Sequence, residues 1–321
     1  MEVPTNGRYL PESQHRSACV AAEAGVPPAP RPRPARWTGA SPTLARWTGR
    51  YRPLVGTEPP TRYNAPIKIA SWNVNSLNVR LPHLEQWLTA FAPDVVGIQE
   101  TKMEDHKFPD AVLAGLGYRS VFAGQKTYNG VALLSREPAQ DVQIGIPGFE
   151  DEQKRVIAGT VNRVRIINLY VVNGQDVGTD KYDYKLRWLE AVHAWVASEL
   201  QKYPELVVMG DFNIAPDARD VHDPLVWNEN HILTSTAERG ALNKLLQLGL
   251  HDAFRLHSED AGVFSWWDYR AAGFRRDLGL RIDLTLVSDA LKARALASGI
   301  DREPRTWDRP SDHAPAWVQL G

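Results

Sequence analysis

The sequence contains a single cysteine, Cys19, among its 321 residues. One cysteine cannot form a disulfide within the chain, which excludes a disulfide-stabilised secreted scaffold and any zinc site built from cysteines. No stretch approaches 18 consecutive apolar residues, which excludes a membrane-spanning helix. The chain also has almost no net charge, because 37 Lys and Arg oppose 38 Asp and Glu and give a formal charge of −1. The total charge therefore predicts neither a strongly basic nucleic-acid binder nor an acidic tail.

The charge is unevenly distributed along the chain. Residues 1–62 contain nine Arg, no Lys and four Glu, a charge of +5, and residues 63–321 carry the remaining −6. Proline and arginine alternate in the first segment, most densely over 27–34, and such a composition buries too little apolar surface to offset chain entropy. We therefore predict a disordered Pro/Ala/Arg-rich N-terminal extension over 1–62 and one compact domain over 63–321. The repeated Ala-Arg-Trp-Thr-Gly of 35–39 and 45–49 is a short duplication or a weak nucleic-acid contact.

Hydrophobic periodicity in the second segment alternates between strands and helices. Apolar runs predict strands at 67–72, 95–98, 131–134, 156–160, 164–170, 206–209, 282–287 and 316–318. Apolar residues three and four apart predict helices at 81–91, 182–200, 240–248 and 290–297. Hairpin-like spacings between 118 and 170 favour an α/β or α+β layered fold over a strictly parallel sheet.

Polar clusters lie at the ends of these runs, where a sheet holds the loops that carry ligand-binding groups. They are Trp72-Asn73-Val74-Asn75, Gln99-Glu100-Thr101-Lys102, Tyr170-Val171-Val172-Asn173, Gly210-Asp211-Phe212-Asn213, Arg281-Ile282-Asp283 and Ser311-Asp312-His313. Carboxylates and amides dominate, and these oxygen donors suit Mg²⁺ or Mn²⁺. Taken singly, each cluster also has a structural explanation: Asp211 could cap a turn, and His313 could be an ordinary core histidine.

The combination of clusters, together with Phe264-Ser265-Trp266-Trp267-Asp268-Tyr269-Arg270, resembles the exonuclease III family of abasic-site (AP) endonucleases in the endonuclease/exonuclease/phosphatase superfamily. The resemblance spans about Ile67 to Val318. Gly-Asp-x-Asn and Ser-Asp-His are shared across the superfamily, whereas Gln-Glu-Thr-Lys and the Trp-rich stretch point to the DNA-repair branch. The fold that it implies is an α/β four-layer sandwich of two mixed β-sheets flanked by helices.

The resemblance also implies roles for individual residues. The catalytic set is Tyr170, Asp211, Asn213, Asp283 and His313, in which Asp211 orients and deprotonates the attacking water, and Asp283 orients His313 against the phosphate. The metal set is Asn73, Glu100, Asp211, Asn213 and Asp312. The substrate-binding set is Asn75, Lys102, Asn173, Trp266, Leu280 and Ile282, of which the last three surround a pocket for a bare sugar. Arg281 is a further candidate phosphate contact, with a solvated surface residue as the alternative.

The function implied is a Mg²⁺-dependent hydrolase, with Mn²⁺ as a substitute, that cleaves duplex DNA 5′ to abasic sites and degrades it from 3′ ends as an exodeoxyribonuclease III. We expect a monomeric protein of the cytoplasm, near the nucleoid in a bacterium, with no membrane partner. Two alternatives stay open: a superfamily phosphodiesterase or phosphatase acting on a small phosphorylated or lipid substrate, and a non-catalytic DNA-binding relative. The first would lack the Trp266–Arg270 stretch, and the second would lack acidic positions that are present here.

Overall fold

The computed structural model describes residues 66–321, and the expected N-terminal extension lies outside the described residues. The described chain forms two six-stranded mixed sheets and one two-stranded ribbon. The strands are β1 Ile67–Asn73, β2 Val95–Gln99, β3 Arg119–Ala123, β4 Val131–Ser135, β5 Gln140–Ile144, β6 Val156–Val161, β7 Val164–Tyr170, β8 Leu206–Asp211, β9 Leu250–Asp252, β10 Trp266–Trp267, β11 Gly279–Leu280, β12 Asp283–Ser288, β13 Ala295–Ile300 and β14 Ala316–Leu320. The helices are α1 Leu77–Phe91, α2 Asp110–Gly115, α3 Asp180–Lys202, α4 Thr236–Leu246 and α5 Asp289–Lys292.

The two large sheets have similar layouts. The first has the order β13-β14-β1-β2-β4-β3 and the second β5-β6-β7-β8-β12-β9. Each contains one parallel pair, β1 with β2 and β7 with β8, and its other pairs are antiparallel. The predicted mixed sheets are thus confirmed.

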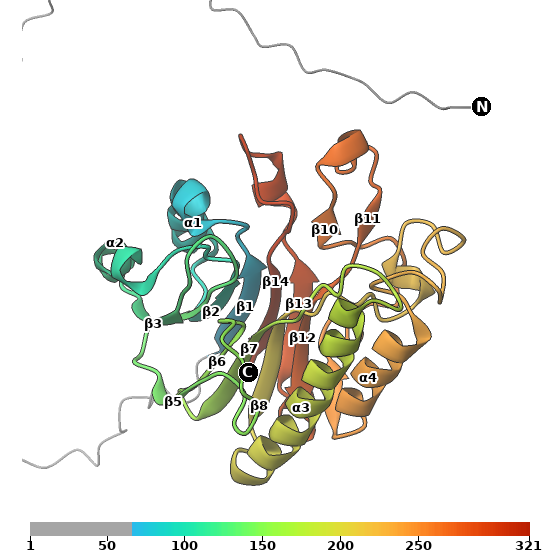
Figure 1. Ribbon diagram of the computed structural model, residues 1–321. Coiled ribbons are helices and arrows are strands. Elements are labelled where there is room, and N and C mark those ends of the chain that lie inside the picture. Colours follow the sequence, from blue (N-terminus) through green and yellow to red (C-terminus); the bar gives the residue numbers. More distant parts are fainter. Residues whose placement is uncertain (1–65) are drawn as a thin grey trace, which may run out of the picture. The chain divides into compact units, whose positions relative to one another are not determined.

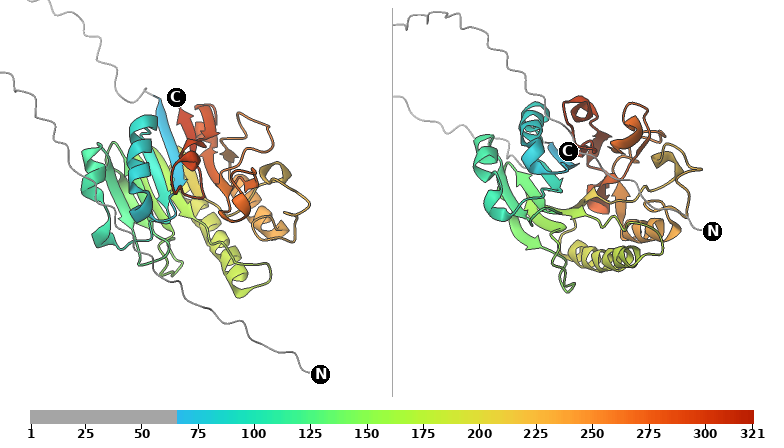
Figure 2. Two further views of the ribbon diagram at one scale, coloured as in Figure 1. Left: turned by 90° about the horizontal axis from the view of Figure 1, so that it is seen from above. Right: turned by 45° about the horizontal axis from the view of Figure 1, so that its top comes forward.

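Three buried apolar clusters define four layers (Figures 1 and 2). One cluster packs β1, β2 and β4 against α1 and α2, a second lies between the sheets, and a third packs β7, β8 and β12 against α3 and α4. Strands covered on both faces have continuous apolar sequences such as Leu206-Val207-Val208-Met209, because neither face meets water. The α/β four-layer sandwich expected from the sequence is therefore the observed fold.

The expected helix over 290–297 is wrong in its second half. Only Asp289–Lys292 is helical, and Ala295–Ile300 forms β13, which pairs with β14 along the sheet edge. Alanine favours a helix locally, but pairing with a neighbouring strand overrides that preference. The helix expected over 240–248 instead starts at Thr236, where Ser235 and Glu238 form a capping box.

Candidate active site

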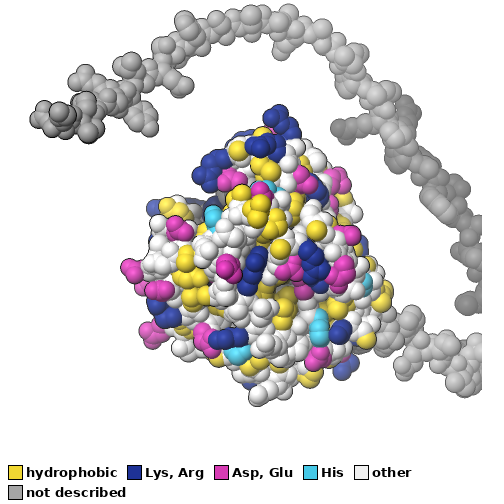
Figure 3. Space-filling view, turned by 90° about the vertical axis from the view of Figure 1, so that its right-hand side faces the viewer, with side chains coloured by type: hydrophobic (Ala, Val, Ile, Leu, Met, Phe, Trp, Pro, Cys, Tyr) yellow, Lys and Arg dark blue, Asp and Glu magenta, His cyan; other side chains and the backbone are white. Residues whose placement is uncertain are grey.

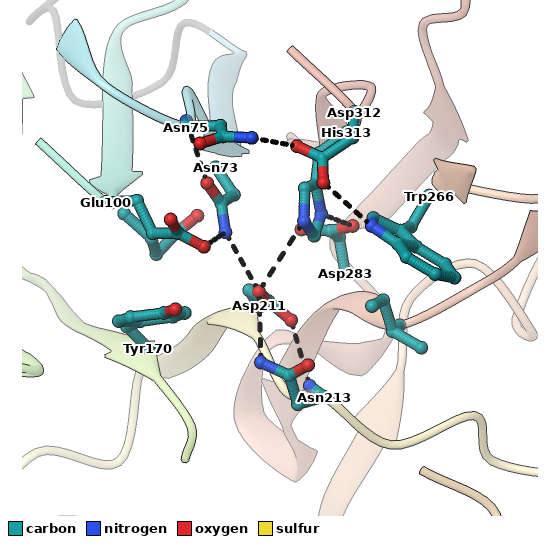
Figure 4. A network of polar contacts seen from close by, with 12 residues as sticks. Asn73, Asn75, Glu100, Tyr170, Asp211, Asn213, Trp266, Asp283, Asp312 and His313 are labelled. Carbon is teal, nitrogen blue, oxygen red and sulfur yellow. Dashed lines mark hydrogen bonds and ion pairs between the residues drawn. The ribbon is translucent and has the colours of Figure 1, made fainter. Parts of the chain in front are cut away.

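The polar strand ends meet at one edge of the sandwich (Figure 4). Asn73 ends β1, Tyr170 ends β7 and Asp211 ends β8, so the carboxyl ends of parallel strands supply these side chains. Strand β12 runs antiparallel to β8, and its first residue, Asp283, is therefore paired directly with Asp211. The loop before β14 brings His313 to the same edge.

The backbone at this edge is tightly constrained. A Cβ on Gly210 would lie 1.9 Å from the carbonyl oxygen of Leu169, so only glycine allows β7 and β8 to approach at this point. Four site residues without this freedom nevertheless have positive φ, namely Asn75, Glu100, Lys102 and Asn213, with φ between 43° and 55°. Such conformations persist where the surrounding structure enforces them, and they gather at functional sites.

Asp211 is the centre of the hydrogen-bond network. Asn73 Nδ2 donates to Asp211 Oδ2 at 2.9 Å and to Glu100 Oε1 at 2.8 Å, and the backbone N–H of Asn213 donates to Asp211 Oδ1 at 2.9 Å. Asp211 is buried, and burial raises the pKa of its carboxyl group, as do the charges of Asp283 and Glu100, while His313 and the Asn73 hydrogen bond oppose them. Asp211 is therefore a stronger base than an exposed aspartate.

His313 is held between two carboxylates. Its Nδ1 lies 2.9 Å from Asp283 Oδ2, and its Nε2 lies 3.8 Å from Asp211 Oδ2. Burial lowers the pKa of the imidazole, but the charges of Asp283, Asp211 and Asp312 outweigh burial and raise it to about 10. The ring is thus an imidazolium at neutral pH, with one N–H directed to Asp283 and the other facing Asp211 at the wall of the site.

A second set of hydrogen bonds is centred on Asn75 and Asp312. Asn75 Nδ2 donates to Asp312 Oδ1 at 2.8 Å, and the indole Nε1 of Trp266 donates to Asp312 Oδ2 at 3.0 Å. Lys102 Nζ donates to Asn75 Oδ1 at 2.5 Å and pairs with Glu100 Oε2 at 2.7 Å. The predicted residues at positions 75, 102, 266 and 312 thus belong to one connected network.

Tyr170 and Asn173 complete the site from the end of β7. Burial, followed by the charges of Glu100 and Asp211, raises the pKa of the Tyr170 phenol well above its usual value, so the phenol is a hydrogen-bond donor at neutral pH. The guanidinium of Arg155 lies over the Tyr170 ring, 4.5 Å from its centroid. Asn173 Nδ2 donates to Asn213 Oδ1 at 3.1 Å.

A cavity of about 480 Å³ opens beside these groups. Its polar wall includes Asp211 and His313, and its apolar wall includes Trp266 and Ile282. Leu280 is different: it is fully buried and packs behind the wall in the cluster that contains Ile282. Residues outside the predicted catalytic, metal and substrate-binding sets also line the cavity, although Asp268 and Arg270 belong to the Trp-rich motif: His222, Trp227, Ile232, Leu233, Asp268 and Arg270. Most come from the 221–234 loop, which has no strand or helix periodicity to mark it.

Arg281 fits neither expectation, because it is a buried residue that does not line the cavity and is not a solvated surface residue. Its side chain is 1% exposed and forms ion pairs with Asp220 at 2.6 Å and Asp252 at 2.8 Å. Arg281 lies in the short link between β11 and β12 and is not among the residues that line the cavity, so it is held among structural carboxylates instead.

The donors in the site fit a hard divalent cation. Among the described residues, side-chain atoms of Glu100, Asp211 and His313 lie within 4.8 Å of one another, and the two carboxylates would hold the ion because a protonated imidazole has no free lone pair. In the described part of the chain, the ion pairs of Glu100, Asp211 and Asp283 are with Lys102 and His313, Asp312 adds a fourth carboxylate, and Asp283 Oδ1 is buried without a hydrogen-bond partner. This excess of negative charge and oxygen donors suits Mg²⁺ or Mn²⁺ better than a soft metal.

Comparison with known proteins agrees with this geometry. Residues 70–313 match the Endonuclease/Exonuclease/phosphatase family. The Exodeoxyribonuclease III of Haemophilus influenzae is 34% identical over 269 residues, which cover 79% of this chain and 100% of that protein. The 3′-5′ exonuclease NExo of Neisseria meningitidis is 47% identical with a TM-score of 0.77, and an AP endonuclease of Archaeoglobus fulgidus is 36% identical with a TM-score of 0.77. The alignment with each of these two structures covers 79% of this chain and 99% of the solved chain.

The sequence motifs, the observed fold and these relatives all indicate the same family. No described helix is long and apolar enough to cross a membrane. The chain belongs to the endonuclease/exonuclease/phosphatase family, in its exonuclease III branch, and is a DNA repair nuclease of this metal-dependent group.

Proposed function

We propose that this protein uses Mg²⁺ to hydrolyse phosphodiester bonds of duplex DNA 5′ to abasic sites and at 3′ ends. The observation that carries the proposal is the cavity, in which an apolar wall of Trp266 and Ile282 directly adjoins Asp211 and His313. A sugar seated on the apolar wall would present its phosphate to the polar wall. The same site would then serve an internal abasic nucleotide and a terminal one.

Phosphodiester hydrolysis requires an activated water and stabilisation of the charge that develops on the phosphate. Asp211 would orient the water and accept its proton, since its carboxylate is buried and its pKa is raised. Asn213 holds Asp211 through its backbone N–H and would aim its amide at the water or phosphate. His313, kept protonated and oriented by Asp283, would donate to a phosphate oxygen.

The leaving oxygen needs a donor on the opposite side of the phosphorus. Tyr170 is a neutral phenol at that edge and would donate to the phosphate or the leaving group. Glu100 would be the main metal carboxylate, with Asn73, Asp211, Asn213 and Asp312 contributing directly or through water. The bound Mg²⁺ would supply charge neutralisation.

Substrate choice would rest on the size and apolar character of the cavity. An abasic nucleotide rotates out of the duplex at low cost because it has no base to unstack or unpair. Relatives indicate both substrates: NExo of Neisseria is described as a 3′ phosphatase bound to a product DNA hairpin, and the Archaeoglobus fulgidus relative as an AP endonuclease. We further propose that the protein acts as a monomer in the cytoplasm.

DNA affinity would come from local cations because residues 63–321 carry a charge of −6. On the face shown in Figure 3, basic and acidic side chains are interspersed, and neither sign of charge covers the whole face. Phosphate contacts by Lys102 and by bound Mg²⁺ would then supply much of the attraction, and affinity would fall steeply with salt.

The direct test incubates the wild-type protein and Asp211→Asn with duplexes that carry an abasic site, a recessed 3′ end or a 3′ phosphate. We expect EDTA to abolish wild-type cleavage, Mg²⁺ to restore it, and Asp211→Asn to lose at least 100-fold in kcat, a typical contribution of general base catalysis. The control is Asp289→Asn, since this aspartate is 76% exposed on α5. Near-wild-type cleavage by Asp211→Asn would contradict the assignment, and hydrolysis of inositol phosphates instead of DNA would favour the small-substrate alternative.

A second experiment tests the pocket. Trp266→Ala removes both the aromatic ring and the hydrogen bond to Asp312, whereas Trp266→Phe removes the hydrogen bond but keeps a smaller aromatic ring. If the ring selects the substrate, the alanine variant loses discrimination between abasic and intact duplex while the phenylalanine variant keeps most of it. Equal losses in both variants on both substrates would mean that Trp266 acts only through Asp312.

A further inference from the structure

Lys185 is a buried cation that lies directly behind the active site. It is located in the second turn of α3, and its side chain is fully buried. Fully buried lysines are rare because removing an ammonium group from water is costly unless hydrogen bonds and an opposite charge compensate. Here the compensation comes from three separate segments of the chain.

The ammonium group donates to two backbone carbonyls and one carboxylate. Lys185 Nζ lies 2.7 Å from the carbonyl oxygen of Asn213 and 3.1 Å from that of Asn173, and it pairs closely with Glu238 Oε1. Asn173 follows β7 and Asn213 follows β8, so one cation joins the two loops that reach the site from the second sheet. Their side chains also bond to each other at 3.1 Å.

Glu238 fixes the third segment. Its carboxylate accepts from the backbone N–H groups of Leu233 and Ser235 at the start of α4, and also pairs with Lys185. The loop leading to this point contains cavity-lining residues, among them Trp227 and Leu233. Lys185 and Glu238 therefore connect both catalytic loops to the loop that walls the cavity.

A glycine next to Asn173 leaves room for the aliphatic part of the Lys185 side chain. Gly174 follows Asn173 with a φ of +93°, and a Cβ there would lie 3.1 Å from Lys185 Cδ. Any other residue at position 174 would have a strained backbone conformation, and its Cβ would crowd the aliphatic part of the Lys185 side chain. Glycine at this turn therefore leaves the space that Lys185 occupies.

We propose that Lys185 is a positioning residue for the nuclease reaction: its buried ammonium group fixes the carbonyls of Asn173 and Asn213 and thereby the direction of their side-chain amides at the scissile phosphate. Lys185 itself touches no reacting atom. The inference rests on the proposed function for its kinetic part, while the placement of the two amides can be measured without any substrate.

The test compares Lys185→Met, which keeps the length of the side chain and removes its donors, with Arg165→Met. Arg165 forms another buried ion pair, with Glu199, near the far end of the same helix and of β7, with N–O at 2.7 Å. Both variants should lose stability, so both are assayed well below their unfolding midpoints. We expect Lys185→Met to lower kcat about 10- to 100-fold, as misplacement by about an ångström does, with less than threefold change in KM. Arg165→Met should keep kcat within twofold.

The double variant Lys185→Met/Glu238→Gln separates positioning from simple charge burial. Removing only the lysine leaves Glu238 as an unpaired buried carboxylate, and that alone can disturb folding. The double variant has no unpaired charge but still lacks the contacts to Asn173 and Asn213. It should remain as impaired in kcat as Lys185→Met. Recovery of kcat to within threefold of wild type would overturn the proposal.

The readout without substrate is the side-chain NH₂ resonances of Asn173 and Asn213 in ¹⁵N NMR spectra. We expect these two signals to shift in Lys185→Met and in the double variant, and to stay in place in Arg165→Met. Unchanged amide signals in Lys185→Met would refute the positioning role. If wild-type protein cleaves no DNA while the amide signals shift as expected, the proposed function fails and the positioning of the two amides stands.

Discussion

Replacing Asp283 by asparagine tests how this site sets the charge of its histidine. Asp283 is 1% exposed, and its Oδ2 accepts from Nδ1 of His313 at 2.9 Å. Its main chain is held by Ser265 Oγ, which accepts from the N–H of Asp283 at 3.0 Å. The substitution keeps the shape and removes one negative charge, so the backbone should stay in place while the imidazolium loses its nearest counter-charge.

The size of the effect follows from the kind of hydrogen bond that is lost. A bond to a charged group contributes about 1.5–3 kcal/mol and a neutral one about 0.5–1.5 kcal/mol, a difference of roughly 1–1.5 kcal/mol. That corresponds to a decrease of about one unit in the pKa of His313 and to about tenfold in rate if the imidazolium acts in the transition state. The amide can also turn its NH₂ toward the ring and misorient it, so tenfold is the minimum expected loss in kcat.

The pH dependence has a defined sign. Asp283 stabilises the charged ring, and the pKa of His313 is raised to about 10 in the folded protein against about 6.5 when unfolded. Its stabilising contribution is complete below pH 6.5 and is lost as the pH rises through about 10. Asp283→Asn should therefore destabilise the metal-free protein most at pH 6 and least above pH 10.

The assays are kcat against pH, ¹H NMR titration of His313 in the metal-free protein, and urea unfolding at pH 6 and pH 10. The alkaline limb of kcat and the titration midpoint should both move to lower pH in the variant. A variant with kcat within threefold of wild type and an unmoved midpoint would show that Asp283 does not control the histidine.

Three further substitutions or deletions test separate parts of the structure. Gly210→Ala should abolish folding or cost about 3 kcal/mol or more in urea unfolding, because its Cβ would lie 1.9 Å from the Leu169 carbonyl oxygen; full stability would contradict the close approach of β7 and β8. Arg281→Met should lower stability by about 3–5 kcal/mol, since it leaves Asp220 and Asp252 buried without their partner, while the salt dependence of DNA binding stays unchanged; a shallower salt slope would restore Arg281 as a phosphate contact. Deletion of residues 1–62, which carry +5, should reduce the salt slope of DNA affinity if the extension contacts phosphates, and an identical slope would exclude such contacts.

The sequence by itself determined the strand core and the order of the polar clusters. Runs such as Leu206-Val207-Val208-Met209 are apolar at every position because the strand is covered on both faces, and this pattern can be read without a structure. The clusters that contain Asn73, Glu100 and Asp211 follow such runs directly, so their placement at strand ends could be predicted from the chain order alone.

Tertiary structure decided which side chains became partners. Arg281 and Lys185 both appear in the sequence as ordinary cations, yet Arg281 pairs with Asp220 and Asp252, and Lys185 joins two loops to α4. Local pattern also failed at Ala295–Ile300, which became a strand because β14 offered an edge to pair with. Periodicity reports which face of a segment avoids water, whereas pairing depends on groups distant in the chain, and only the packed layers bring those groups within hydrogen-bond distance.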